Sequence, residues 1–162
     1  MKSIKLKNDI YIDSTSIAHN RKKLSDILNY KYILATTTTS TTNVSKVVFN
    51  SIVQQNGGFL LSNGSIVIPS GITRIRVCAS VFIDVSNSSN RYFWGRIKKN
   101  SSLMSGNLTP TNGDTYLSCS IPPTVIDVEE GDLITLEADN TCSGKNRTGR
   151  SNTWILIEAI SN

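Results

Sequence analysis

From residue 30 onward, apolar and polar residues alternate in short runs separated by turn-forming residues. The clearest run is 73–85, where every second residue from Ile75 to Val85 is apolar, so it predicts a strand with one buried face. Its other face carries Arg74, Arg76, Cys78, Ser80, Phe82 and Asp84. Further strands are predicted at 91–99, 103–108, 114–128 with an interruption at Pro122-Pro123, 132–139 and 153–160. Many short strands of this kind are typical of an all-β sandwich or barrel.

The segment before that strand is less regular. Residues 32–42 are rich in Thr and suit either a low-complexity linker or an edge strand with one polar face. Val47, Phe49 and Val53 are predicted to share one face of the next strand. A strand over 66–68 is expected to end at the Pro-Ser-Gly turn that follows it.

The amino-terminal segment has a different pattern. Residues 1–12 hold two short alternating patches, which predict a small hairpin or an arm that pairs with another chain. Residues 13–29 predict a helix with a seam spaced as in a coiled coil, and an isolated helix of this length is marginal in water. Its seam residues are Ile17, Asn20, Leu24 and Ile27. We expect this helix to pack against identical chains or against its own domain, which divides the chain into a stem, 1–29, and a head, 30–162.

Charge and hydropathy exclude two classes of partner. The net charge is +5, but residues 1–34 carry seven Lys or Arg and three Asp, while the remainder carries ten basic and nine acidic residues. A nearly neutral head lacks the dense basic face expected of a nucleic-acid-binding domain. No run of about 18 apolar residues indicates a membrane span, and no apolar run follows the first lysines as in a signal peptide.

Residues that could carry chemistry are few. The only histidine, His19, lies in the predicted stem, so a catalytic site with a nucleophile of the head is not supported. The three cysteines have no metal-binding spacing and are predicted to be free thiols. Glu129, Glu130 and Asp132 are interpreted as a polar turn between strands rather than as a calcium site or a carboxylate pair. We therefore predict that the chain is not an enzyme and holds neither a metal nor a cofactor.

Three segments of the head resemble the jelly roll shared by the complement globular heads and the tumour-necrosis-factor ligands. They are IVIPSGITRIRVCASVFID at 66–84, VEEGDLITLEA at 128–138 and TWILIEAI at 153–160. The amino-terminal IYIDSTSIAHNRKKLSDIL at 10–28 resembles the stem segments of bacteriophage tail fibres and baseplate receptor-binding proteins. Together these resemblances imply an all-β, jelly-roll β-sandwich head, a short stem made of a β-arm and a helix, and a homotrimer.

The resemblance also implies a function. The chain is expected to be a phage tail or baseplate adhesin whose stem binds other tail or baseplate proteins and whose head binds a host cell-wall polysaccharide. Such a protein assembles in the host cytoplasm and becomes part of the virion, which agrees with the missing signal peptide. The alternatives are a structural tail or baseplate protein without a receptor site and a stand-alone carbohydrate-binding module.

Candidate ligand-binding residues follow from the strand order of the resembled fold. Its last strand runs toward the stem, so loops 86–91, 109–115 and 140–152 are expected together at the far end. These loops and the strand ends beside them offer amides, guanidinium groups and aromatic rings, which suit a saccharide. The candidates are Arg91, Tyr92, Trp94, Asp114, Tyr116, Lys145, Asn146, Arg147 and Arg150. The same loops also suit solvated turns, and a site at protomer interfaces along the side is a third possibility.

Overall fold

The computed structural model divides the chain into two units, Met1–Tyr30 and Lys31–Asn162. It describes residues 4–6, 10–12, 30–38, 41–42, 46–84, 91–111, 116–140, 147–148 and 152–160. The first unit contains a hairpin of β1 (Ile4–Leu6) and β2 (Ile10–Ile12), with Ile4 opposite Ile12. The hairpin interpretation of this segment is therefore confirmed.

The predicted stem helix over 13–29, with its seam residues Ile17, Asn20, Leu24 and Ile27, lies outside the described residues. Within the described ranges, no helix is long and apolar enough to cross a membrane.

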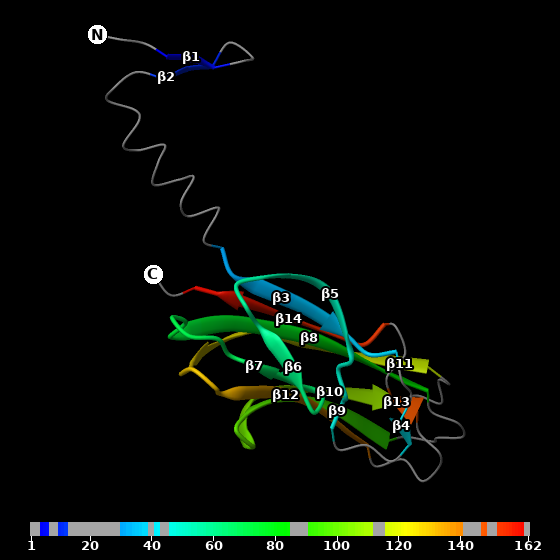
Figure 1. The fold of residues 1–162 in the computed structure, drawn as a ribbon. Coiled ribbons are helices and arrows are strands. Elements are labelled where there is room, and N and C mark those ends of the chain that lie inside the picture. Colours follow the sequence, from blue (N-terminus) through cyan, green and yellow to red (C-terminus); the bar gives the residue numbers. More distant parts are fainter. Residues whose placement is uncertain are drawn as a thin grey trace. The chain divides into compact units, whose positions relative to one another are not determined.

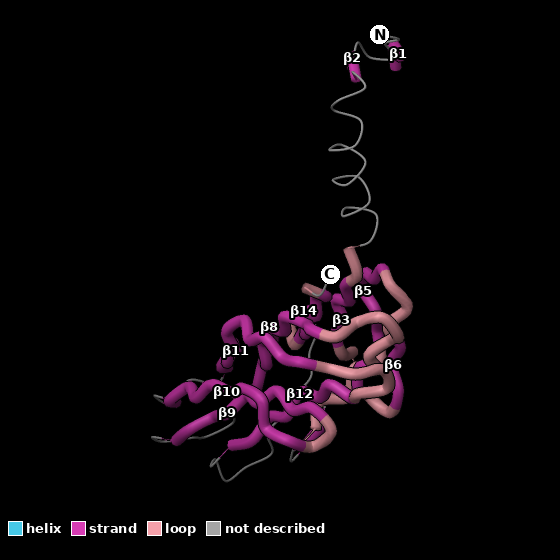
Figure 2. Tube along the Cα trace, turned by 90° about the vertical axis from the view of Figure 1, so that its left-hand side faces the viewer, coloured by secondary structure: helices cyan, strands magenta, loops and turns pink. Residues whose placement is uncertain are grey.

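The second unit is built from two antiparallel sheets that lie face to face (Figures 1 and 2). Sheet one has the order β5-β3-β14-β8-β11, and the short strands β13 and β4 continue it beside the end of β8. Its strands are β3 (Tyr32–Thr36), β4 (Thr41–Thr42), β5 (Ser51–Asn56), β8 (Arg74–Asp84), β11 (Tyr116–Asp127), β13 (Arg147–Thr148) and β14 (Trp154–Ala159). Sheet two has the order β6-β7-β12-β9-β10. Its strands are β6 (Leu60–Ser62), β7 (Ser65–Val67), β9 (Arg91–Lys99), β10 (Ser102–Thr111) and β12 (Leu133–Asn140).

The chain changes sheet repeatedly, between β5 and β6, β7 and β8, β8 and β9, β10 and β11, β11 and β12, and β12 and β13. Such crossings place strands that are distant in sequence side by side, as in a jelly roll. The predicted all-β jelly-roll sandwich is confirmed.

Alternation along the strands fills the space between the sheets. The predicted inward face of β8 is confirmed for Ile75, Val77, Ala79 and Val81, which are at most 1% exposed. The facing sheet contributes Phe93, Ile97, Ile134 and Leu136, all fully buried. Burial of each large side chain contributes roughly 1.5–3 kcal/mol to folding, so this layer is the main source of stability.

The prediction that Val53 shares a buried face with Val47 and Phe49 is wrong. Val53 is 54% exposed, whereas Val47 and Phe49 are buried. The reason is that Val47 and Phe49 precede β5 and do not share its alternation. Within β5, Ile52 lies opposite the buried Ala35, so its neighbour Val53 falls on the outer side.

Neither interpretation of residues 32–42 describes β3. This strand pairs with β14 on one side and β5 on the other, so it is neither a linker nor an edge strand. Its alternate residues Ile33 and Ala35 are fully buried. By contrast, the interruption expected at Pro122-Pro123 is confirmed as a register shift in the pairing of β11 with β8, since proline has no N–H for the ladder.

A tight hairpin that the sequence analysis did not predict joins β6 and β7. Its turn consists of Asn63 and Gly64, with φ angles of 47° and 76°. An Asn-Gly pair between short apolar runs is the strongest local signal for such a turn, because both positions need a positive φ. The carbonyl of Gly64 accepts a hydrogen bond of 3.3 Å from the backbone N–H of Phe49.

Candidate functional site

The outer surface of sheet one carries apolar side chains that the core does not use. On β14 the inward residues Ile155 and Ile157 are fully buried, whereas their neighbours Trp154 and Leu156 point outward and are partly exposed. The same alternation on β3 and β8 places further apolar groups beside them. We call this surface the apolar face; it consists of Leu34, Val53, Cys78, Phe82, Trp154 and Leu156.

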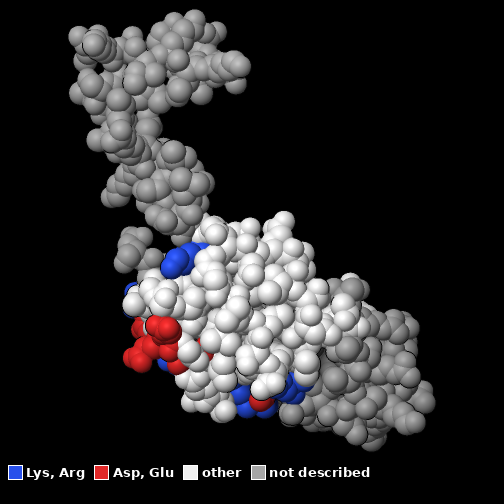
Figure 3. Space-filling model, in the orientation of Figure 1, with Lys and Arg blue, Asp and Glu red and all other residues white. Residues whose placement is uncertain are grey.

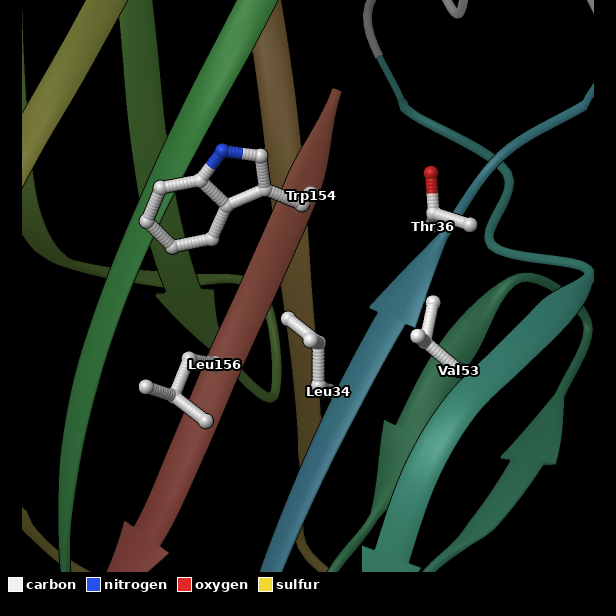
Figure 4. Close-up of a pocket in the computed structure, with 5 residues that line it drawn as sticks. All are labelled: Leu34, Thr36, Val53, Trp154 and Leu156. Carbon is white, nitrogen blue, oxygen red and sulfur yellow. The ribbon is translucent and has the colours of Figure 1, made fainter. Parts of the chain in front are cut away.

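Strand pairing places the residues of the apolar face opposite one another on neighbouring strands. Leu156 lies opposite Leu34 on one side and Cys78 on the other, and Trp154 lies opposite Thr36. Figure 4 shows Leu34 between Leu156 and Val53, with Trp154 and Thr36 at the end of the same hollow. The hollow measures about 450 Å³. Its lining is almost wholly apolar, so it suits apolar side chains from another chain better than a polar ligand.

Charged pairs border the apolar face near the carboxyl end of β14. The Nε and Nη2 atoms of Arg76 both lie 2.7 Å from Oε2 of Glu158. Arg74 and Asp127 form a more exposed pair, 2.6 Å apart. Burial and then the charge of Glu158 raise the pKa of the Cys78 thiol above its ordinary value, so the thiol is neutral. An apolar centre with a polar rim is the usual composition of a protein interface.

Strand ends beside the predicted ligand-binding loops lie at one end of the sandwich. Asp84 at the end of β8 lies opposite Tyr116 of β11 on one side and opposite Arg147 of β13 on the other. On sheet two, Arg91 lies opposite Thr111. For Arg91, Tyr116 and Arg147 the structure describes the backbone alone. The remaining loop candidates, Asp114, Lys145, Asn146 and Arg150, lie outside the described residues.

The two aromatic candidates of β9 belong to a different surface. Tyr92 and Trp94 lie on the outer face of sheet two, because Phe93 between them points into the core. Tyr92 is 51% exposed. The guanidinium carbon of Arg96 lies 5.5 Å from the centre of the Trp94 ring. The predicted residues are therefore divided between two sheets, and Arg96, which belongs with Trp94, was absent from the prediction although alternation along 91–99 could have found it.

The acidic string at 129–132 forms the turn between β11 and β12. Oδ2 of Asp132 accepts a hydrogen bond of 2.8 Å from the backbone N–H of Glu129, and Nδ2 of Asn100 donates to its Oδ1. Nζ of Lys99 lies 3.4 Å from the same carboxylate. Within the part of the chain that the structure describes, no group of three or more His, Cys, Asp or Glu could hold a metal ion.

These contacts predict an acid-sensitive turn. Burial disfavours the charged carboxylate, but the Glu129 N–H, the Asn100 amide and the Lys99 ammonium outweigh it and lower the pKa of Asp132 below its ordinary value. A carboxylate whose pKa is lowered by folding stabilises the protein at pH values above its unfolded-state pKa of about 4. This stabilisation is lost as the pH falls through the pKa of the folded state. We expect Asp132→Asn to lower the free energy of unfolding by about 1–3 kcal/mol at pH 7. The difference should shrink below about pH 4, as measured by denaturant unfolding.

Asp127→Asn is the matched control for that experiment. Its carboxylate also has a lowered pKa because of Arg74, but both side chains are largely exposed, so screening leaves the pair with little effect on stability. Equal destabilisation by the two substitutions would contradict the role given to Asp132.

No family model matches the sequence, and no curated protein matches it. Solved structures are similar in fold. A crystal structure of murine APRIL at pH 5.0 superposes with a TM-score of 0.62 and 13% identity, and covers 82% of this chain and 100% of that chain. Two further crystal structures of murine APRIL, at pH 8.0 and 8.5, have TM-scores of 0.60 with 11% and 12% identity and the same coverage. The chain therefore has the tumour-necrosis-factor-like jelly-roll fold.

Proposed function

We propose that this chain is a homotrimeric adhesin of a bacteriophage tail or baseplate. In this proposal the stem, 1–29, binds other tail or baseplate proteins and trimerises through Ile17, Asn20, Leu24 and Ile27. The head, 30–162, binds a host cell-wall polysaccharide without catalysing a reaction. The protein assembles in the host cytoplasm and functions in the virion.

The observation that carries the proposal is the apolar face of sheet one. Contiguous apolar patches are uncommon on the surface of monomeric proteins and mark sites of interaction. A Trp, two Leu and a neutral thiol at its centre suit the same kind of side chains from identical chains. The tumour-necrosis-factor-like fold favours three copies, since jelly rolls of the resembled family are usually trimers.

Support for a phage adhesin comes from the amino-terminal sequence. The segment at 10–28 resembles phage stem segments, and it directly precedes a head of the kind used in trimeric adhesins. A trimer presents three copies of each surface ligand site, so weak saccharide binding at one site becomes strong attachment through multivalency.

The test is adsorption of the assembled chain to bacterial surfaces. Fluorescently labelled full-length protein should bind cells of a susceptible species and their protease-treated cell walls, and it should bind defined polysaccharides on a microbial glycan array. Leu156→Arg, which should prevent assembly, is the matched control and should bind at least tenfold more weakly. An assembled chain that binds no cell and no glycan would support the structural tail protein instead. A monomer that binds glycans would support the stand-alone module.

A further inference from the structure

A second hollow lies on the outer face of sheet two, over the hairpin of β9 and β10. It measures about 500 Å³ and is lined mainly by Trp94, Arg96, Leu103, Gly106 and Leu108. These residues come from two neighbouring strands, whose pairing is continuous from Ser105 to Thr111 after an irregularity between Leu103 and Ser105. Paired strands give the hollow a rigid floor. Its size falls within the range of about 300–1,000 Å³ that is usual for small-molecule sites.

The absence of a side chain at Gly106 creates the hollow. Gly106 lies opposite Arg96, while Leu108 lies opposite Trp94 and Leu103 lies opposite Lys98. The position across from the guanidinium is therefore open, and side chains close it at both ends. A Cβ at residue 106 would come within 2.9 Å of the carbonyl oxygen of Gly95, so close packing of the strands also requires glycine there.

The walls of the hollow are amphipathic. Leu103 and Leu108 are 59% and 42% exposed, which is high for leucine in a strand. Trp94 adds an aromatic ring to this apolar surface, and Arg96 stacks over the ring with its guanidinium carbon 5.5 Å from the ring centre. Stacking of this kind holds an arginine in place while its N–H groups stay available to a ligand.

Arg96 is the charged residue among those that line the hollow. Glu137 lies opposite it on β12 but forms its ion pair with Lys98. Lys98 is paired with Glu137 at 2.6 Å, and Lys99, Arg74 and Arg76 each have an acidic partner. Among the ion pairs between described side chains, none includes Arg96. In Figure 3 charged side chains gather mainly at the left edge of the head and at its lower edge. With a single arginine in its lining, the hollow suits one anionic group rather than a polyanion that needs a continuous basic surface.

We propose that the β9–β10 hollow is the saccharide-binding site and that it recognises a pyranose ring bearing an anionic substituent. The C–H face of the ring packs on Trp94 and Leu108, and its carboxylate or phosphate accepts charge-assisted hydrogen bonds from Arg96. Tyr92, further along the same outward row of β9, extends the surface toward a second sugar. This inference rests on the proposed adhesin function and relocates its ligand from the end loops to the side of the sandwich.

The experiment is a titration of the full-length chain by isothermal calorimetry and ligand-observed NMR. The probes are a glucuronate-containing oligosaccharide, a glucosyl phosphate and a neutral gluco-oligosaccharide. We expect one of the two anionic probes to bind at least tenfold more tightly than the neutral probe. Tighter binding of the glucuronate-containing oligosaccharide would identify the ligand as a uronate. Tighter binding of the glucosyl phosphate would identify it as a phosphate-linked polymer.

Variants test the residues directly. Arg96→Gln should weaken binding of the anionic probe about tenfold without affecting binding of the neutral probe. Trp94→Ala should weaken binding of both probes, and Trp94→Phe should recover part of that affinity. Arg74→Gln removes the same charge from an exposed pair on sheet one, outside the hollow, and it should change affinity less than twofold. Circular dichroism and solution mass establish that each variant is folded and assembled, and Leu108→Ser replaces Trp94→Ala if the latter unfolds.

Three outcomes would overturn this inference. If the chain adsorbs to cells but binds none of the probes, or binds them equally well with Arg96→Gln, the receptor site lies elsewhere and the adhesin function stands. If Trp94→Ala lowers the solution mass, the hollow is a contact between copies. If the chain binds neither probes nor cells, the proposed function fails together with the site.

Discussion

Replacement of Leu156 by arginine is expected to convert the protein to a folded monomer. Leu156 occupies the centre of the apolar face, with Leu34 and Cys78 opposite it on the neighbouring strands. An arginine at this position would be buried without a partner in an assembled protein, and such burial costs several kcal/mol per ion. In the monomer the side chain simply extends into water. Sedimentation velocity should therefore show the mass of one chain, 17.7 kDa, with a strand-rich circular dichroism spectrum.

Leu60→Arg serves as the control for this substitution. Leu60 lies on β6 of sheet two and is 63% exposed, so a charge there should change neither mass nor melting temperature. Assembly that survives Leu156→Arg would mean that the apolar face is not the contact between copies.

The largest loss of stability from a small change is expected for Gly64→Ala. Residue 64 has a φ of 76°, and an added Cβ would lie 2.7 Å from the Cα of Val48, a backbone atom that cannot move aside alone. The positive φ costs about 1–2 kcal/mol for any residue with a Cβ. Displacement of the neighbouring segment adds about 1–3 kcal/mol, as in other overpacked sites. The sum is about 2–5 kcal/mol, so at about 2–4 °C per kcal/mol the melting temperature should fall by roughly 4–20 °C.

Gly131→Ala separates the two contributions. Residue 131 has a φ of 85°, but a Cβ there would meet no atom within 4 Å. Its substitution should show the backbone cost alone, measured by calorimetry under the same conditions. A loss at Gly131 as large as that at Gly64 would indicate that the close approach of Val48 has no effect.

Much of the fold could be predicted because strand alternation survives wherever one face is buried. In β8 the four alternate residues that were predicted to face inward are buried. In β11 the two adjacent prolines predicted the irregularity in its pairing with β8. The outward position of Val53 could not be predicted, because Val47 and Phe49 lie before β5 and their alternation does not continue into it. The face of each β5 residue is determined by its pairing with β3, a partner strand that the local sequence does not identify.

The candidate site was less predictable for a related reason. Alternation on 91–99 places Trp94 and Arg96 on one face, but the open position across from Arg96 depends on Gly106, which belongs to another strand. Likewise, Leu34 and Leu156 are distant in sequence and meet only through the order β3-β14-β8. Pairing between strands, rather than composition, determines which side chains form each surface.

The mass of the full-length protein in solution tests most directly the proposed assembly of identical chains through the apolar face of sheet one. Sedimentation equilibrium at micromolar concentration should give three times the chain mass of 17.7 kDa. A species of one chain mass under these conditions would contradict the proposed assembly.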